Sequence, residues 1–142
     1  MIYCDTSLLV ALVASERFSA EAAIWFDGNR PSDLGYSPWT EVEVASALAR
    51  KQRSRTFNAD GRAAAISRWR RLARPLTMLA VDPDDFASAA TLVDAGPRGL
   101  RAGDALHLAI ARRAGFALAT LDRDLADAAE SVGVEVALRP PA

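Results

Sequence analysis

Four acidic residues stand where short apolar segments of this sequence meet helical ones. Asp5 ends the first apolar segment, and Asp122 directly follows a later one. Glu43 lies early in one helical segment, and Asp104 opens another. Taken singly, Asp5 and Asp104 are typical helix caps, and Asp122 is a typical turn residue. Taken together, they are candidates for a cluster of carboxylates that act on one substrate.

Carboxylates that are brought together repel one another, which raises their pKa values and destabilises the fold unless a cation neutralises them. All-oxygen ligands are typical of Mg²⁺ or Mn²⁺. The sequence has one histidine and one cysteine, too few for a typical tetrahedral zinc site. A hard divalent cation can polarise a phosphoryl oxygen and activate a water molecule. The acids therefore indicate metal-assisted hydrolysis of a phosphodiester, provided that the fold gathers them.

The apolar pattern predicts five short strands that alternate with helices. Strands are expected at residues 1–4, 34–37, 76–81, 116–120 and 134–136, and helices at 8–14, 19–26, 40–53, 59–74, 82–95, 103–114 and 124–131, with a loop at 96–99. This alternation is typical of a parallel sheet covered by helices on both faces, in a single α/β domain over residues 1–142. Ligands bind such sheets outside the carboxyl ends of the strands, where the four acids are expected to converge.

Composition narrows the class of protein. The 142 residues are 51% hydrophobic and 25% charged, which excludes a disordered chain, and the lone cysteine cannot form an internal disulfide. No apolar run approaches the roughly 20 residues of a membrane span, and the first five residues lack the basic segment of a secretory signal. We therefore expect a cytoplasmic protein with no membrane partner.

The net charge of −1 hides a basic block. Residues 50–74 hold nine arginines and lysines against one aspartate, whereas the segments on either side are net acidic. Such a block can bind phosphates without moving the isoelectric point. It can equally be the solvated face of a helix, and the sequence leaves both interpretations open.

Four motifs follow one another along the chain: Ile2-Tyr3-Cys4-Asp5-Thr6-Ser7-Leu8-Leu9, the segment 37–48 (SPWTEVEVASAL), the segment 103–109 (GDALHLA) and the segment 118–126 (LATLDRDLA). In order and spacing they resemble the PIN-domain ribonucleases, specifically the VapC-type toxins of bacterial toxin–antitoxin pairs. The resemblance implies a three-layer α/β/α sandwich with a four- to five-stranded parallel sheet. It also implies a Mg²⁺- or Mn²⁺-dependent endoribonuclease that acts on tRNA or other structured RNA. Its implied partners are a second copy, forming a homodimer, and a VapB-type antitoxin whose C-terminal segment wraps the toxin and often places an arginine near the acids.

The resemblance also assigns roles to residues. It implies that Asp5 and Asp104 are direct metal ligands. It implies that Glu43 and Asp122 complete the catalytic set, by ligating a metal or orienting water. The polar neighbours that it implies are Thr6, Ser7 and Thr120.

Three further residues have competing interpretations. Glu41 and Glu43 cannot share a helix face, and the resemblance selects Glu43, which stands six residues after Ser37 as in the family pattern, so Glu41 is expected to face solvent. Asp124 is either an outer ligand or, as we favour, a helix cap. His107 lies three residues after Asp104 in an apolar helix, and we expect a packed residue that positions Asp104 in preference to a general base.

The aromatic residues Trp25, Trp39 and Trp69 could stack on bases, but their apolar neighbours favour core or subunit contacts. Trp69, flanked by arginines, is the best of the three for contact with RNA or an antitoxin. Cys4 is expected to be buried filler.

Other functions remain as alternatives to a nuclease. The main one is a non-catalytic, Mg²⁺-binding acidic α/β module that holds a partner. A phosphotransfer receiver domain is disfavoured because the one lysine, Lys51, lies in a helical stretch and not at a strand end. A haloacid-dehalogenase-like phosphatase is disfavoured because Ser7 stands where that chemistry needs an aspartate.

Overall fold

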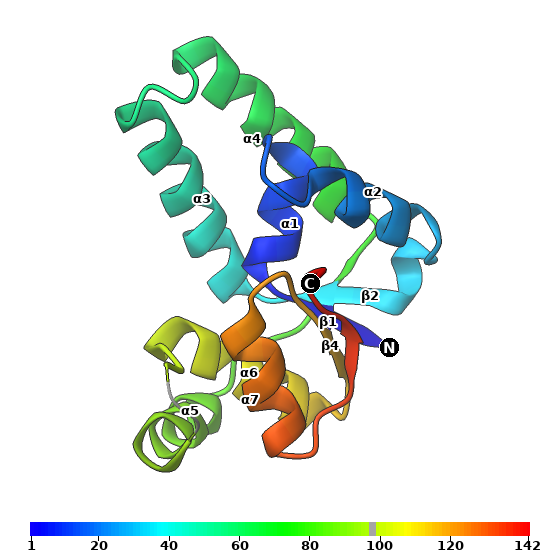
Figure 1. Cartoon of the computed structure of the whole chain (residues 1–142), viewed down its shortest axis with the longest axis vertical. Coiled ribbons are helices and arrows are strands. Elements are labelled where there is room, and N and C mark those ends of the chain that lie inside the picture. Colours follow the sequence, from blue (N-terminus) through cyan, green and yellow to red (C-terminus); the bar gives the residue numbers. More distant parts are fainter. Residues whose placement is uncertain (97–98) are drawn as a thin grey trace.

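A five-stranded, all-parallel sheet forms the centre of the molecule in the computed structural model, which describes residues 1–96 and 99–142 (Figure 1). The strands are β1 (Ile2–Cys4), β2 (Leu34–Tyr36), β3 (Thr77–Met78), β4 (Ala117–Ala119) and β5 (Val136–Leu138). Their order is β3-β2-β1-β4-β5, and each neighbouring pair is parallel. The predicted parallel sheet is therefore confirmed. Residues 97 and 98 of the expected loop lie outside the described part.

In the described part of the chain, seven α-helices occupy the predicted segments. They are α1 (Thr6–Val13), α2 (Ser19–Asp27), α3 (Pro38–Arg53), α4 (Ala59–Ala73), α5 (Pro83–Ala95), α6 (Ala102–Ala114) and α7 (Arg123–Ser131), with a short 3₁₀ helix at Pro31–Asp33. The last strand was predicted two residues too early. Gly133 has a φ of 78°, and the amide of Val134 bonds back to the carbonyl of Ala129 at 2.9 Å, so these residues close the end of α7.

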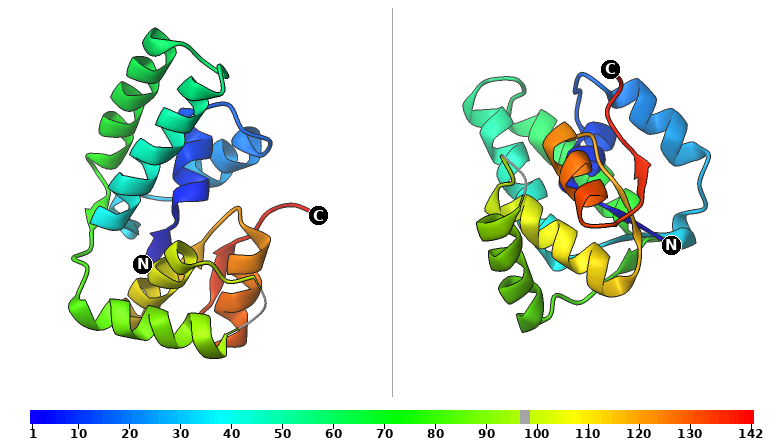
Figure 2. Two further views of the ribbon diagram at one scale, coloured as in Figure 1. Left: turned by 90° about the vertical axis from the view of Figure 1, so that its left-hand side faces the viewer. Right: turned by 60° about the horizontal axis from the view of Figure 1, so that its bottom comes forward.

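The two faces of the sheet have separate apolar cores, which gives the expected three layers. Helices α1 to α4 cover one face and α5 to α7 cover the other (Figure 2). Because successive side chains of a strand point to opposite faces, Cys4 packs into the first core and Tyr3 into the second. Leu118 and Ala119 of β4 divide in the same way. Cys4 is fully buried, as expected.

The sheet has its topological switch point at β1. From β1 the chain runs outward through β2 and β3, and it then returns to place β4 and β5 on the opposite side of β1. Ligands bind parallel sheets in the crevice outside the strand ends at such a point. Asp5 directly follows β1 and Thr120 directly follows β4, so both lie at this crevice. No helix in the described residues is long and apolar enough to cross a membrane.

An ion pair between the buried carboxylate of Asp85 and the partly exposed guanidinium of Arg113 fastens α5 to α6, the helix that carries Asp104. Asp85 is 1% exposed, and its two oxygens accept bonds from Arg113 Nε at 2.6 Å and Nη2 at 2.9 Å. The same carboxylate accepts the backbone amide of Asp82 at 2.8 Å, in a capping box that starts α5. Burial acts to raise the pKa of Asp85, but these bonds outweigh it and lower that pKa from 3.8.

We predict that Asp85→Asn lowers the free energy of unfolding at pH 7 by roughly 2 kcal/mol, because Arg113 loses its charge partner on a half-exposed surface. The folded pKa of Asp85 is depressed, so its contribution is complete above the ordinary value of 3.8 and disappears as the pH falls through the lower folded value. Urea unfolding at pH 7 and pH 3 measures this. Asp84→Asn, an exposed neighbour in the same helical turn, is the control. If Asp85→Asn lowers the free energy of unfolding as much at pH 3 as at pH 7, the ion pair is not the cause of its effect.

Candidate active site

Asp5 is held rigidly at the carboxyl end of β1. Its Oδ1 accepts bonds from the Ser7 amide at 2.7 Å, the Ser7 hydroxyl at 2.6 Å and the Leu8 amide at 3.3 Å, so it caps α1. Its Oδ2 accepts a bond from the Thr120 hydroxyl at 2.8 Å. Burial raises the pKa of Asp5, although the hydrogen bonds from Ser7 and Thr120 oppose that rise. Ser7 and Thr120 are therefore polar neighbours of the site, as expected.

Glu43 projects from the second turn of α3 and is held from two sides. Its Oε2 accepts a bond from the Thr6 hydroxyl at 2.6 Å and lies 2.5 Å from Nε2 of His107. Burial acts to raise the pKa of Glu43, but the hydrogen bonds from His107 and Thr6, with the charge of Arg101, outweigh it and lower that pKa. Glu43 is consequently a carboxylate with a fixed orientation at neutral pH.

His107 belongs to a buried chain of polar groups that runs beneath Glu43. Its Nδ1 lies 2.8 Å from the Tyr3 hydroxyl, which in turn lies 2.7 Å from the Ser37 hydroxyl. A proton on Nε2 gives a consistent order of donors from Ser37 through Tyr3 and His107 to Glu43. The expectation that His107 positions Asp104 is wrong. The shared helix face was inferred correctly, but the imidazole points across to α3, where Glu43 supplies its partner.

Asp104 and Asp122 are bridged by a single guanidinium. Arg101 donates from Nε to Asp104 Oδ2 and from Nη2 to Asp122 Oδ2, both at 2.8 Å. Asp122 also accepts the amide of Leu125 at 3.0 Å and so caps α7. Burial raises the pKa of Asp104, and the nearby Asp122 and Asp5 add to that rise, whereas Arg101 opposes it. Burial is the largest cause of this shift, and repulsion among the acids adds to it even with Arg101 in place.

Gly103 lets the start of α6 lie tightly against α3. A Cβ at this position would stand 2.7 Å from Oε1 of Glu43 and 3.5 Å from the indole of Trp39. Any larger residue must therefore displace one of these side chains. Because Gly103 has no side chain, the first turn of α6 can lie this close to Glu43.

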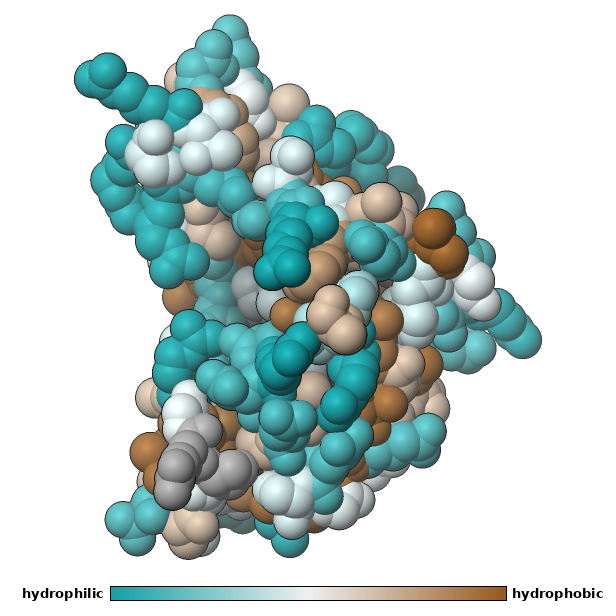
Figure 3. Space-filling view, in the orientation of Figure 1, coloured by the Kyte–Doolittle hydropathy of each residue, from teal (hydrophilic) through white to brown (hydrophobic). Residues whose placement is uncertain are grey.

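All four predicted acids line one cavity of about 660 Å³, together with Thr6, Ser7 and Arg101. In the space-filling view, hydrophilic side chains flank an indentation between the half of the molecule that holds α3 and α4 and the half that holds α5 to α7 (Figure 3). Within residues 1–96 and 99–142, however, no three acidic, histidine or cysteine side chains already form a ligand set for a metal. The protein's own donors, chiefly Arg101, His107 and Thr6, occupy several of the carboxylate oxygens.

Two acids that were weighed against this set lie outside the cavity. Glu41 is exposed, as expected, although its carboxylate also accepts the indole N–H of Trp69 at 2.8 Å. Asp124 is exposed in the first turn of α7, and the expectation that it caps this helix is wrong. Because α7 begins at Arg123, the N-cap position falls on Asp122.

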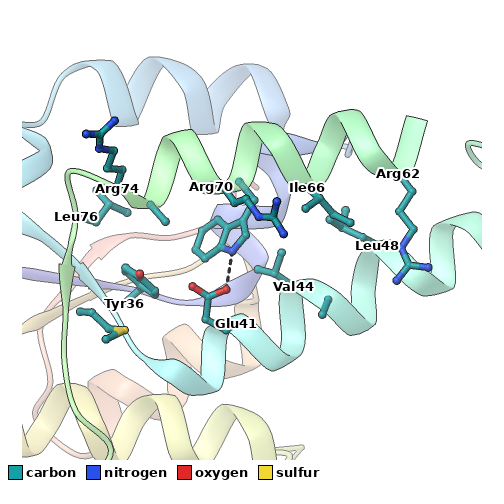
Figure 4. A pocket seen from close by; sticks show the side chains of 13 residues that line it. Tyr36, Glu41, Val44, Leu48, Arg62, Ile66, Arg70, Arg74 and Leu76 are labelled. Carbon is teal, nitrogen blue, oxygen red and sulfur yellow. Dashed lines mark hydrogen bonds between the residues drawn. The ribbon is translucent and has the colours of Figure 1, made fainter. Parts of the chain in front are cut away.

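A second cavity, of about 700 Å³, lies between α3 and α4 and has a different character (Figure 4). Trp69 forms its floor, 5% exposed and packed edge-on against Tyr36 with ring centroids 5.4 Å apart. Trp69 is thus a core residue and has no free face for stacking on RNA. Three arginines of the basic block line this cavity, namely Arg62, Arg70 and Arg74, while Arg50 lines the acidic one.

Three residues of the site were absent from the predicted set: Arg101, Tyr3 and Ser37. Arg101 carried a usable signal, because a cation three residues before Asp104 on a helix is within reach of it. Tyr3 and Ser37 carried none, since Tyr3 meets Ser37 across 34 residues of the sequence and meets His107 across 104.

Comparison with known proteins shows the family of this chain. The family model named PIN domain matches residues 2–131. Ribonuclease VapC35 of Mycobacterium tuberculosis is 34% identical over 141 residues, which covers 96% of this chain and 95% of that protein.

Solved structures share the fold. VapC20 of Mycobacterium tuberculosis, described as a sarcin–ricin loop cleaving toxin, superposes with a TM-score of 0.71 at 21% identity and covers 94% of this chain and 96% of its own. A toxin–antitoxin complex from Klebsiella pneumoniae has a TM-score of 0.64 at 20% identity, covering 89% of this chain and 91% of that one. With the family model spanning nearly the whole sequence, this chain belongs to the PIN-domain family, and within it to the VapC type.

Proposed function

We propose that this protein is a metal-dependent endoribonuclease toxin that hydrolyses RNA phosphodiester bonds and is neutralised by a cognate VapB-type antitoxin. The observation that carries the proposal is the convergence of Asp5, Glu43, Asp104 and Asp122 on one cavity at the switch point of the sheet. The relative VapC35 is named a ribonuclease, which supports RNA as the substrate.

The donor set fits a hard divalent cation such as Mg²⁺ or Mn²⁺. Every acidic ligand offers oxygen, and burial, with a smaller contribution from the nearby Asp122 and Asp5, raises the pKa of Asp104. Asp5 and Asp104 would hold the cation, with Glu43 and Asp122 as further ligands or as groups that orient water. When bound, the cation supplies charge stabilisation at the scissile phosphate and a water of lowered pKa.

The chain's own residues supply orientation and proton transfer. Glu43 is deprotonated at neutral pH, and its Oε2 is fixed by Thr6 and His107, so Oε1 is the oxygen that can accept a proton from the attacking water. In-line attack by water leaves a 5′-phosphate and a 3′-hydroxyl. The ribose 2′-hydroxyl takes no part in this reaction.

The cavity rim has the charge needed to hold a polyanion next to the acids. Arg17, Arg50 and Arg101 all line it, and arginine binds phosphate through two parallel bonds. We infer a structured RNA, such as a tRNA, as the substrate class.

Exposed apolar side chains support a protein partner. Val42, Met78 and Phe86 are each more than half exposed on α3, β3 and α5, an arrangement that favours association. We propose that a homodimer and an antitoxin complex cover such surfaces, in the cytoplasm, and that residues 1–142 act as one domain.

Replacing Asp104 by Asn should reduce RNA cleavage by on the order of a hundredfold or more, because a charged group at the reaction centre is lost. Purified protein, freed of antitoxin, is incubated with total cellular RNA and MgCl₂, and new 5′ ends are sequenced. Asp27→Asn, an exposed acid at the end of α2, should cleave like the wild type. Asp5→Asn should also be inactive. Metal binding without any cleavage by the wild type would favour the non-catalytic module instead.

A 2′-deoxy nucleotide at the mapped cut site should leave cleavage intact in a synthetic RNA, because water is the nucleophile. Mass spectrometry of the products should show 5′-phosphate and 3′-hydroxyl ends. Loss of cleavage with the deoxy substrate, together with cyclic phosphate ends in the normal RNA, would reject hydrolysis by water.

Gly103→Ala should slow cleavage by roughly ten- to a hundredfold, because its methyl group would lie 2.7 Å from Oε1 of Glu43 and displace that carboxylate. Thermal unfolding should show little loss, since alanine favours helix over glycine by about 1 kcal/mol. Gly28→Ala, where a Cβ meets only ordinary contacts of 3.4 Å or more, is the matched control. Equal activity of the two variants would show that the spacing of Glu43 from α6 is unimportant.

A further inference from the structure

Arg101 is a cation of the acidic cavity that already pairs with two of its acids. Its guanidinium donates to Oδ2 of Asp104 and to Oδ2 of Asp122, both at 2.8 Å. Its side chain is nevertheless 72% exposed, whereas those of Asp104 and Asp122 are 13% and 24% exposed. The ion pairs thus hold a solvent-facing arginine over two largely buried carboxylates.

A divalent cation and this guanidinium compete for the same oxygens. Both are positive and would repel one another at contact distance, and both require the lone pairs of Asp104 and Asp122. Arg101 is the N-cap residue of α6, and its side chain makes no capping hydrogen bond. Its side chain can therefore turn away from the acids without unwinding the helix that presents Asp104.

We propose that Arg101 exchanges partners during the reaction cycle. In the metal-free protein it neutralises Asp104 and Asp122; metal binding displaces it, and the released guanidinium binds a phosphate of the RNA beside the scissile bond. Arginine suits both states, because its planar fork pairs with carboxylate and with phosphate in two-bond geometry. The backbone of Arg101 lies about one helical turn from Asp104 and keeps the released guanidinium at the cavity rim. This inference rests on the proposed function and adds a substrate-binding residue to it.

Arg123 provides a matched control for charge. It follows Asp122 directly, but its Nη2 bonds to the carbonyl of Pro141 at 3.2 Å and contacts neither acid. Replacing Arg123 by Gln removes one positive charge close to Asp122, as Arg101→Gln does, but leaves the hydrogen bonds of Arg101 to Asp104 and Asp122 in place. A difference between variants at 101 and 123 therefore reports the bridge and not long-range electrostatics.

The first measurement is calorimetric titration of Mn²⁺, without RNA, into the wild type, Arg101→Gln and Arg123→Gln. We expect Arg101→Gln to bind Mn²⁺ about fivefold more tightly than Arg123→Gln, since a competing ion pair of partly exposed groups is gone. We also expect its melting temperature without metal to fall, because two buried carboxylates lose their counter-charge. An affinity equal to or weaker than that of Arg123→Gln overturns the exchange.

The second measurement is cleavage, at saturating Mn²⁺, of a synthetic RNA that spans the mapped cut site. Arg101→Gln should raise KM about tenfold despite its tighter metal binding, and Arg101→Lys should recover part of that loss. Unchanged or improved cleavage by Arg101→Gln overturns the phosphate contact. Equal Mn²⁺ affinities of the variants, together with normal cleavage by the wild type, refute the exchange and leave the proposed function standing. Absence of Mn²⁺ binding in every variant refutes the metal site and the proposed function with it.

Discussion

The main physical constraint on this structure is the mutual repulsion of the carboxylates that a parallel sheet and its helices bring to one edge. Asp5 and Asp122 lie at this edge because β1 and β4 are neighbours that end together, and α3 and α6 add Glu43 and Asp104. Gathered in this way, the acids destabilise the fold unless each is compensated. The compensation is specific: hydroxyls and amides hold Asp5, an imidazole and a hydroxyl hold Glu43, and one arginine holds the remaining two.

These compensating groups explain how the fold tolerates the four acids and how two of the acids stay accessible from solvent. Asp5 is buried and doubles as the cap of α1, so its position is fixed by the same bonds that start the helix. Glu43 is fixed by His107, whose far nitrogen reaches Tyr3 in the opposite core. Asp104 and Asp122 are compensated by a residue that is itself mostly exposed. The site thus has a rigid part, built into the sheet and α3, and a part whose counter-ion can leave.

The sequence was sufficient for the sheet, the helices and the four acids, because apolar periodicity and the position of each acid beside a strand are local signals. It was insufficient wherever the partner lies far along the chain. His107 was assigned to Asp104, its neighbour on the helix, but its contact is with Glu43 across the interface between α6 and α3. The cap of α7 was shifted by two residues because Asp122 and Asp124 are equally suitable by type. The bridging role of Arg101 requires Asp122, 21 residues away, to be in place.

If the four carboxylates form one cation site, anomalous X-ray scattering from crystals soaked in Mn²⁺ will reveal the ion there. We expect a single region of Mn²⁺ density in direct contact with carboxylate oxygens of Asp5 and Asp104, and the Arg101 guanidinium no longer on Asp104. Mn²⁺ bound elsewhere on the protein, or a cavity in which Arg101 still bridges Asp104 and Asp122 at saturating Mn²⁺, would contradict this expectation.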